Sequence, residues 1–73
     1  MTKIVCDPDK MMGKPTIEGT RLTVENLLEK LASGYSQEDL LQAHPHLTIE
    51  GIRAAFDFAA QSVRNDIVYP MAR

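Results

Sequence analysis

A helical pattern of apolar residues begins just after residue 23. Apolar side chains recur at i, i+3, i+4 and i+7, in the order Val24, Leu27, Leu28 and Leu31. This spacing places them on one face of an amphipathic helix. Thr23 is of a residue type that caps helix N-termini, and Gly34 is suited to follow the last turn. The pattern therefore predicts a first helix over residues 24–33.

Two further helices are predicted downstream. Ser36, followed three residues later by Asp39, approximates a capping box for a second helix. That helix ends near Ala43, because a proline at 45 disfavours helical geometry in the residue before it. Thr48 then caps a third and longest helix, which reaches about residue 65. The face of this helix that packs on the other two is predicted to consist of Ile49, Ile52, Phe56, Ala59, Ala60 and Val63.

The residues outside these helices favour extended structure. Residues 3–6 are β-prone and predict a short strand. Ile17 and Leu22 lie on either side of Gly19, which predicts a second extended segment or a tight hairpin ahead of the first helix. Residues 66–73 predict a tail, or a short strand that needs an edge to pair with.

Together these elements predict a mainly α fold, a three-helix homeodomain-like helix-turn-helix bundle with a short N-terminal β element. The single domain divides into a β element and turn over residues 1–22, the bundle over 23–65 and the tail over 66–73. A domain of this length buries only about 60% of its unfolded surface. We therefore expect it to gain stability from another chain, as a homo-oligomer and most simply a dimer.

Composition narrows the classes of function. Eight Lys and Arg stand against ten Asp and Glu, so any contact with nucleic acid must come from a local basic patch. Cys6 is the single cysteine, which excludes an internal disulfide and fits a reducing cytoplasm. The sequence has neither a leader pattern nor an apolar stretch of bilayer length, so we expect a cytoplasmic protein with no membrane contact.

The stretch MGKPTIEGTRLTV, residues 12–24, invites comparison with a phosphate-binding loop. Gly13 and Lys14 match the last glycine and the lysine of G-x-x-x-x-G-K-[ST]. Prolines at positions 8 and 15 replace the first glycine and the hydroxyl residue, and proline offers no amide donor. We therefore interpret the stretch as a rigid turn.

Arg21 is the residue of this stretch that is best suited to bind a negatively charged group. It is expected to pair with a carboxylate such as Glu18 or Glu25, or else to contact a nucleic-acid phosphate. Elsewhere, His44 and His46 lack a second ligand pair for a metal and a partner for catalysis. We accordingly predict no catalytic residue, no metal site and no cofactor.

The third helix carries two strips beside its predicted core face. One strip has charges of both signs, unlike helices that read DNA bases, and consists of Glu50, Arg53, Asp57 and Arg64. The other lies opposite the predicted core face and has small residues around one aromatic: Gly51, Ala54, Ala55 and Phe58. Such a strip lets a second helix approach closely, so we predict a protein interface there or on the apolar tail residues Ile67, Val68 and Tyr69. The alternative is that Phe58 packs under the tail.

With these motifs the chain resembles a prokaryotic family catalogued as domain of unknown function number 433. The matching segments are DP at 7–8, GKPTIEGTRLTV at 13–24, LASGYSQEDLL at 31–41 and HPHLTIEGIRAAFDFA at 44–59. The resemblance implies a homeodomain-like helix-turn-helix fold with a short β element in front. It also implies an antitoxin-like role beside a small PIN-like nuclease, with repression of the protein's own operon.

The leading hypothesis is a non-enzymatic antitoxin-like module of a toxin–antitoxin pair, which binds a nuclease-like toxin and its operator DNA. The alternative is a dimeric helix-turn-helix transcriptional regulator without a toxin partner. In that case Arg53 on the third helix, with Lys14 or Arg21, contacts the DNA. A homodimeric scaffold is a third hypothesis.

Overall fold

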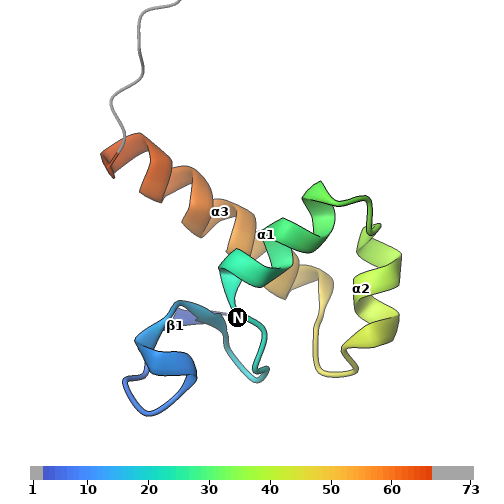
Figure 1. Ribbon diagram of the computed structural model, residues 1–73, viewed down its shortest axis with the longest axis horizontal. Coiled ribbons are helices and arrows are strands. Elements are labelled where there is room, and N and C mark those ends of the chain that lie inside the picture. Colours follow the sequence, from blue (N-terminus) through green and yellow to red (C-terminus); the bar gives the residue numbers. More distant parts are fainter. Residues whose placement is uncertain (1–2, 67–73) are drawn as a thin grey trace, which may run out of the picture.

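Three helices and a two-stranded hairpin make up the chain between residues 3 and 66, the part that the computed structural model describes (Figure 1). The elements are β1 (Ile4–Val5), a short helical turn η1 (Met11–Gly13), β2 (Thr16–Ile17), α1 (Val24–Ala32), α2 (Gln37–Ala43) and α3 (Ile49–Asp66). The predicted mainly helical fold with an N-terminal β element is confirmed. None of the helices in this part of the chain is long and apolar enough to cross a membrane. The tail residues Ile67, Val68 and Tyr69 lie outside the described residues.

The N-terminal segment folds as a hairpin that is joined to the start of α1. β1 and β2 are antiparallel, with Ile4 opposite Ile17. Thr16 also bridges to Thr23, the residue before α1. The N–H of Ile17 donates to the carbonyl of Leu22 at 3.0 Å, which closes a second tight turn. The predicted hairpin ahead of the first helix is therefore confirmed.

Side-chain caps fix where the helices begin. The hydroxyl of Thr23 accepts a hydrogen bond from the N–H of Asn26 at 3.0 Å. Ser36 and Asp39 form both hydrogen bonds of a capping box at the start of α2. The hydroxyl of Thr48 accepts from the N–H of Gly51 at the start of α3. These local bonds explain why the observed helix bounds agree so closely with the predicted ones.

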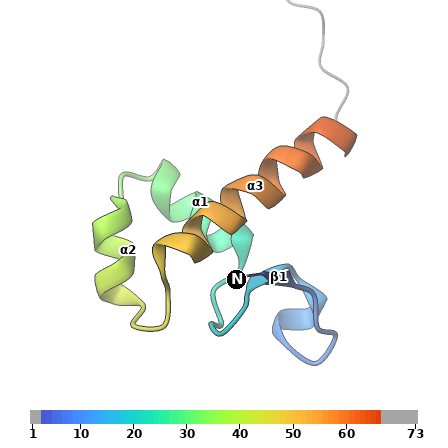
Figure 2. The same ribbon diagram turned by 180° about the vertical axis from the view of Figure 1, so that it is seen from behind.

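The core lies where α3 passes α1 and the hairpin, and both views show this crossing (Figures 1 and 2). α3 packs on α1, on β1 and on β2. The buried apolar residues come from the helices, from β2 and from the segments that join them: Ile17, Leu22, Val24, Leu27, Leu40, Leu47, Ile52 and Ala55. Leu40 is the contribution of α2 to this cluster.

The face that α3 turns to the core differs from the prediction. Ile49 and Phe56 were expected to be buried, but they are 48% and 42% exposed. Ala55 is fully buried instead, and Phe58 packs against the core cluster. At 100° per residue, this is a rotation of about 90° from the expected face. The prediction considered only packing between helices, whereas α3 also packs on the hairpin.

Gly51 permits the close approach of α3 to the hairpin. A Cβ atom built on Gly51 would lie 3.0 Å from Cγ2 of Ile17 and 3.4 Å from Cδ1 of Leu47. A larger residue at this position would require the side chains of Ile17 and Leu47 to give way by a few tenths of an ångström. Gly51 therefore lets α3 lie close to Ile17 in the observed rotation.

Candidate functional site

The stretch with the lysine and two glycines forms a turn whose polar groups bond to one another. The hydroxyl of Thr20 donates to the carbonyl of Ile17 at 2.8 Å and accepts from the N–H of Leu22 at 3.0 Å. Gly19 has a φ of +84°, and the N–H of Thr20 also donates to the carbonyl of Ile17. This geometry fits a type II turn, which needs a positive φ at its third residue. It agrees with the interpretation of the stretch as a structural turn.

The basic residues predicted to touch DNA come from three different segments of the chain. Nζ of Lys14 lies 3.3 Å from Oε1 of Glu25 in an exposed ion pair. Arg53 is exposed on α3. Arg21 is also exposed, and the described residues include no carboxylate that forms an ion pair with it. The expectation that Arg21 pairs within the chain is therefore wrong for this part of the structure.

Arg21 lies at the edge of a shallow depression with two other potentially cationic side chains. Lys10, His46, Gly19 and Thr20 line this depression together with it. Lys10 precedes η1 and His46 follows α2, so the three side chains come from separate connecting segments. Sequence reasoning missed Lys10 and His46 as neighbours of Arg21. No sequence motif links them, because only the fold brings the three connections together.

The predicted interface strip on α3 is not a free surface. Gly51 and Ala55 are buried, while Ala54 and Phe58 are half-buried. Ala54 and Phe58 line a small depression between α3 and β1. The expectation that this strip faces away from the core is therefore wrong, since the rotation of α3 turns it towards the hairpin.

The same rotation exposes a different apolar surface, which we call the α3 stripe. Ile49, Phe56 and Val63 follow one another at intervals of seven residues, and Ala60 lies between the last two. Seven residues are close to two helical turns, so these four side chains share one side of α3. Ile49, Phe56 and Ala60 are exposed, and Val63 is half-buried. The C-terminal half of α3 extends past α1 and the hairpin in both views (Figures 1 and 2).

A row of charged residues follows one edge of the α3 stripe. It consists of Glu50, Arg53, Asp57 and Arg64, all of them exposed. The other edge of the stripe adjoins the core face, where Ile52 is buried. The outward face of α3 is thus an apolar stripe with acids and arginines along one side.

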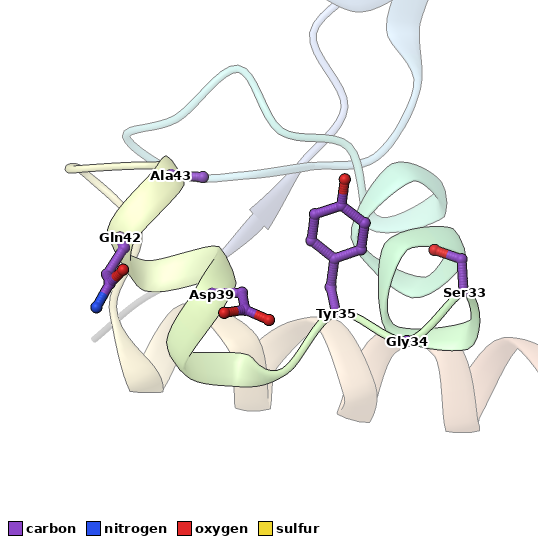
Figure 3. Close-up of a pocket in the computed structure, with 6 residues that line it drawn as sticks. All are labelled: Ser33, Gly34, Tyr35, Asp39, Gln42 and Ala43. Atoms are coloured by element: carbon purple, nitrogen blue, oxygen red, sulfur yellow. The ribbon is translucent and has the colours of Figure 1, made fainter.

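A further depression lies between α1 and α2, and two of its side chains, Tyr35 and Asp39, already have partners within the chain. Figure 3 shows Tyr35 between the end of α1 and the start of α2. Its ring centroid lies 5.2 Å from Nζ of Lys30. The carboxylate of Asp39 accepts from the N–H of Ser36 in the capping box. Among the described residues, moreover, no three His, Cys, Asp or Glu side chains lie close enough together to hold a metal ion.

Comparison with known proteins identifies relatives of the chain. A family model described as "Protein of unknown function (DUF433)" matches residues 4–59, which confirms the resemblance found in the motifs. The uncharacterized protein y4eO of Sinorhizobium fredii (strain NBRC 101917 / NGR234) is 38% identical over 56 residues. That alignment covers 77% of this chain and 25% of y4eO, so the chain matches about a quarter of the length of this relative. No solved structure matches the chain.

Proposed function

We propose that this chain, which belongs to the DUF433 family, is a non-enzymatic antitoxin-like module that binds a nuclease-like protein toxin. The observation that carries protein binding is the outward face of α3. Ile49 and Phe56 are large apolar side chains that this small domain leaves exposed on one helix. Exposed apolar and aromatic residues along one face are typical of protein interfaces.

The charges beside the α3 stripe favour a protein partner over direct reading of DNA by this helix. Glu50 and Asp57 lie on the exposed side of α3 together with its arginines. Helices that enter the major groove present donors to bases and phosphates, and a carboxylate is repelled by phosphate. We propose that the toxin binds the predicted interface residues Ile67, Val68 and Tyr69, which follow α3 in the sequence, and that the α3 stripe makes a separate protein contact.

Co-expression with a nuclease-like protein encoded beside this gene tests the proposal. We expect the wild-type chain to co-purify with the tagged nuclease and to relieve its inhibition of growth. Replacing Ile67, Val68 and Tyr69 together with serine should abolish both effects. Met12→Ser is the matched control, because Met12 is an exposed apolar residue in η1 and is 91% exposed. If the wild-type chain neither co-purifies nor protects the cells, the antitoxin proposal is wrong.

Operator binding is a second candidate function, and the exposure of Arg21 favours it. Arg21, Lys10 and His46 surround one depression, where they can contact a phosphate. A gel-shift titration on the gene's own promoter at low salt should show a band that Arg21→Ala weakens. Lys14→Ala is the control, since the charge of Lys14 is already paired with Glu25. If the wild-type chain gives no band, this function is excluded.

A further inference from the structure

We propose that the α3 stripe binds the α3 stripe of a second copy of this chain, in an antiparallel arrangement centred on Phe56. The inference rests on the proposed function in one respect, namely that the outward face of α3 binds protein. It identifies the protein bound at this face as a second copy of the chain. Isologous interfaces need a surface that is complementary to itself about a two-fold axis. The apolar residues, the charges and the position of α3 in the fold each meet this requirement.

The apolar residues are symmetric about Phe56. Ile49 precedes Phe56 by seven residues and Val63 follows it by seven. When two copies of α3 lie antiparallel about this point, Ile49 of each copy meets Val63 of the other, and the two Phe56 rings meet at the centre. Ala60 is small, so it allows the second helix to approach closely.

The charges are complementary about the same point. A two-fold axis perpendicular to the helices brings the charged edge of one stripe against the charged edge of the other. In an antiparallel pair, two residues face each other when the position midway between them in the sequence lies at the two-fold axis. This midway position is 57 for Glu50 and Arg64, and 55 for Arg53 and Asp57. Each acid therefore faces an arginine of the second copy across a centre close to Phe56. In a parallel pair the two-fold axis runs along the helices and places the two charged edges on opposite sides of the interface, so these ion pairs do not form.

The shape of the fold leaves room for this arrangement. The C-terminal half of α3 extends past α1 and the hairpin (Figures 1 and 2). In an antiparallel pair, this extended half lies along the N-terminal half of the second α3. The two globular parts then lie at opposite ends of the helix pair, whereas a parallel pair would bring them side by side.

Sedimentation of the full chain tests self-association. Small interfaces give weak complexes, so we would measure the sedimentation coefficient from about 5 to 500 µM. We expect a shift from monomer to dimer across this range. Phe56→Asp should abolish the shift while the far-UV circular dichroism spectrum stays unchanged. Met12→Asp, the same change at another exposed apolar residue, should leave the shift intact.

Charge reversal tests the antiparallel arrangement. In the proposed dimer, residue 50 of each copy faces residue 64 of the other, so this contact occurs twice. Glu50→Arg places two arginines at each of these contacts, and Arg64→Glu places two glutamates there. We expect each variant alone to bind itself at least tenfold more weakly than the wild type. An equimolar mixture of the two should associate again, because each variant carries the charge that the other lacks. The double variant with both changes should also associate.

Three results would overturn the proposal. The first is a wild-type chain that stays monomeric at every concentration, even if that monomer binds a nuclease or DNA. The second is a Phe56→Asp variant that associates like the wild type. The third is a mixture of the charge variants that stays monomeric while the wild type dimerises. All these measurements use the chain alone, so a failure of the toxin co-purification leaves them interpretable.

Discussion

Replacing Thr20 with valine should destabilise the whole domain, because it leaves a buried backbone N–H without a partner. The hydroxyl of Thr20 accepts the N–H of Leu22 at 3.0 Å, and Leu22 is 5% exposed. Valine has nearly the same shape as threonine but carries no acceptor. The change therefore tests whether the Gly19–Thr20 turn is a folding device, with little change of packing volume.

The two hydrogen bonds of the Thr20 hydroxyl contribute unequally to the loss of stability expected for Thr20→Val. The carbonyl of Ile17 loses the hydroxyl of Thr20 but keeps the N–H of Thr20 at 3.0 Å. The N–H of Leu22 loses its partner, and leaving a buried donor unpaired costs about 1–3 kcal/mol. A domain of 73 residues has a stability of about 4–11 kcal/mol, so this loss is a large share of the total. The melting temperature should fall by about 4–8 °C for each kcal/mol lost.

Urea unfolding, followed by circular dichroism at 222 nm, measures the loss. Thr20→Ser is the matched control, because serine keeps the hydroxyl and loses only one methyl group, worth about 0.8 kcal/mol. The midpoint for Thr20→Val should therefore lie below the midpoint for Thr20→Ser. A valine variant at least as stable as the serine variant would refute the reasoning. Thr20 would then be open to a role in ligand binding.

Two pairs of substitutions test the turn and the orientation of α3 by the same unfolding assay. Gly19→Ala should lower the free energy of unfolding by about 1–2 kcal/mol, because Gly19 has a φ of +84°. This loss reflects backbone strain alone, since an added Cβ would meet no atom within 4 Å. Gly19→Asn should lower it less, because asparagine tolerates a positive φ better than alanine. Phe58→Ala should lower the free energy of unfolding by about 1–3 kcal/mol because Phe58 packs against the core, whereas Phe56→Ala should change it by no more than about 0.5 kcal/mol at concentrations where the chain is monomeric. Equal losses at the two phenylalanines would contradict the orientation of α3.

The helix bounds were predictable because they depend on contacts between near neighbours. Thr23 caps α1 through a residue three positions away, and Ser36 and Asp39 cap α2 across the same spacing. Such bonds can be recognised from the order of residues alone. The tight turn ahead of α1 was predictable for a similar reason, since Gly19 marks it directly.

The rotation of α3 was not predictable from its own pattern. Apolar residues occur around much of the helix, so both Phe56 and Phe58 were compatible with a core position. The observed orientation depends on packing against α1 and the hairpin, including Ile17, which lies more than thirty residues before Gly51 in the sequence. One sequence signal did point to this contact. A glycine inside a helix costs about 1 kcal/mol relative to alanine, so Gly51 indicates a close approach of another segment.

The geometry separates the residues that the fold requires from those that it does not. Gly19, Thr20 and Gly51 are accounted for by a turn, two hydrogen bonds and a close packing contact. The place of Gly19 and Thr20 in the G-K-P…G-T-R motif is therefore no evidence of a ligand. Phe56 and Ile49 have no such explanation, because this fold leaves them 42% and 48% exposed, and covering the exposed part would stabilise each by about 1 kcal/mol, roughly half of the value for full burial. A second surface that covers them recovers part of this free energy, which is why the α3 stripe is the place to test function first.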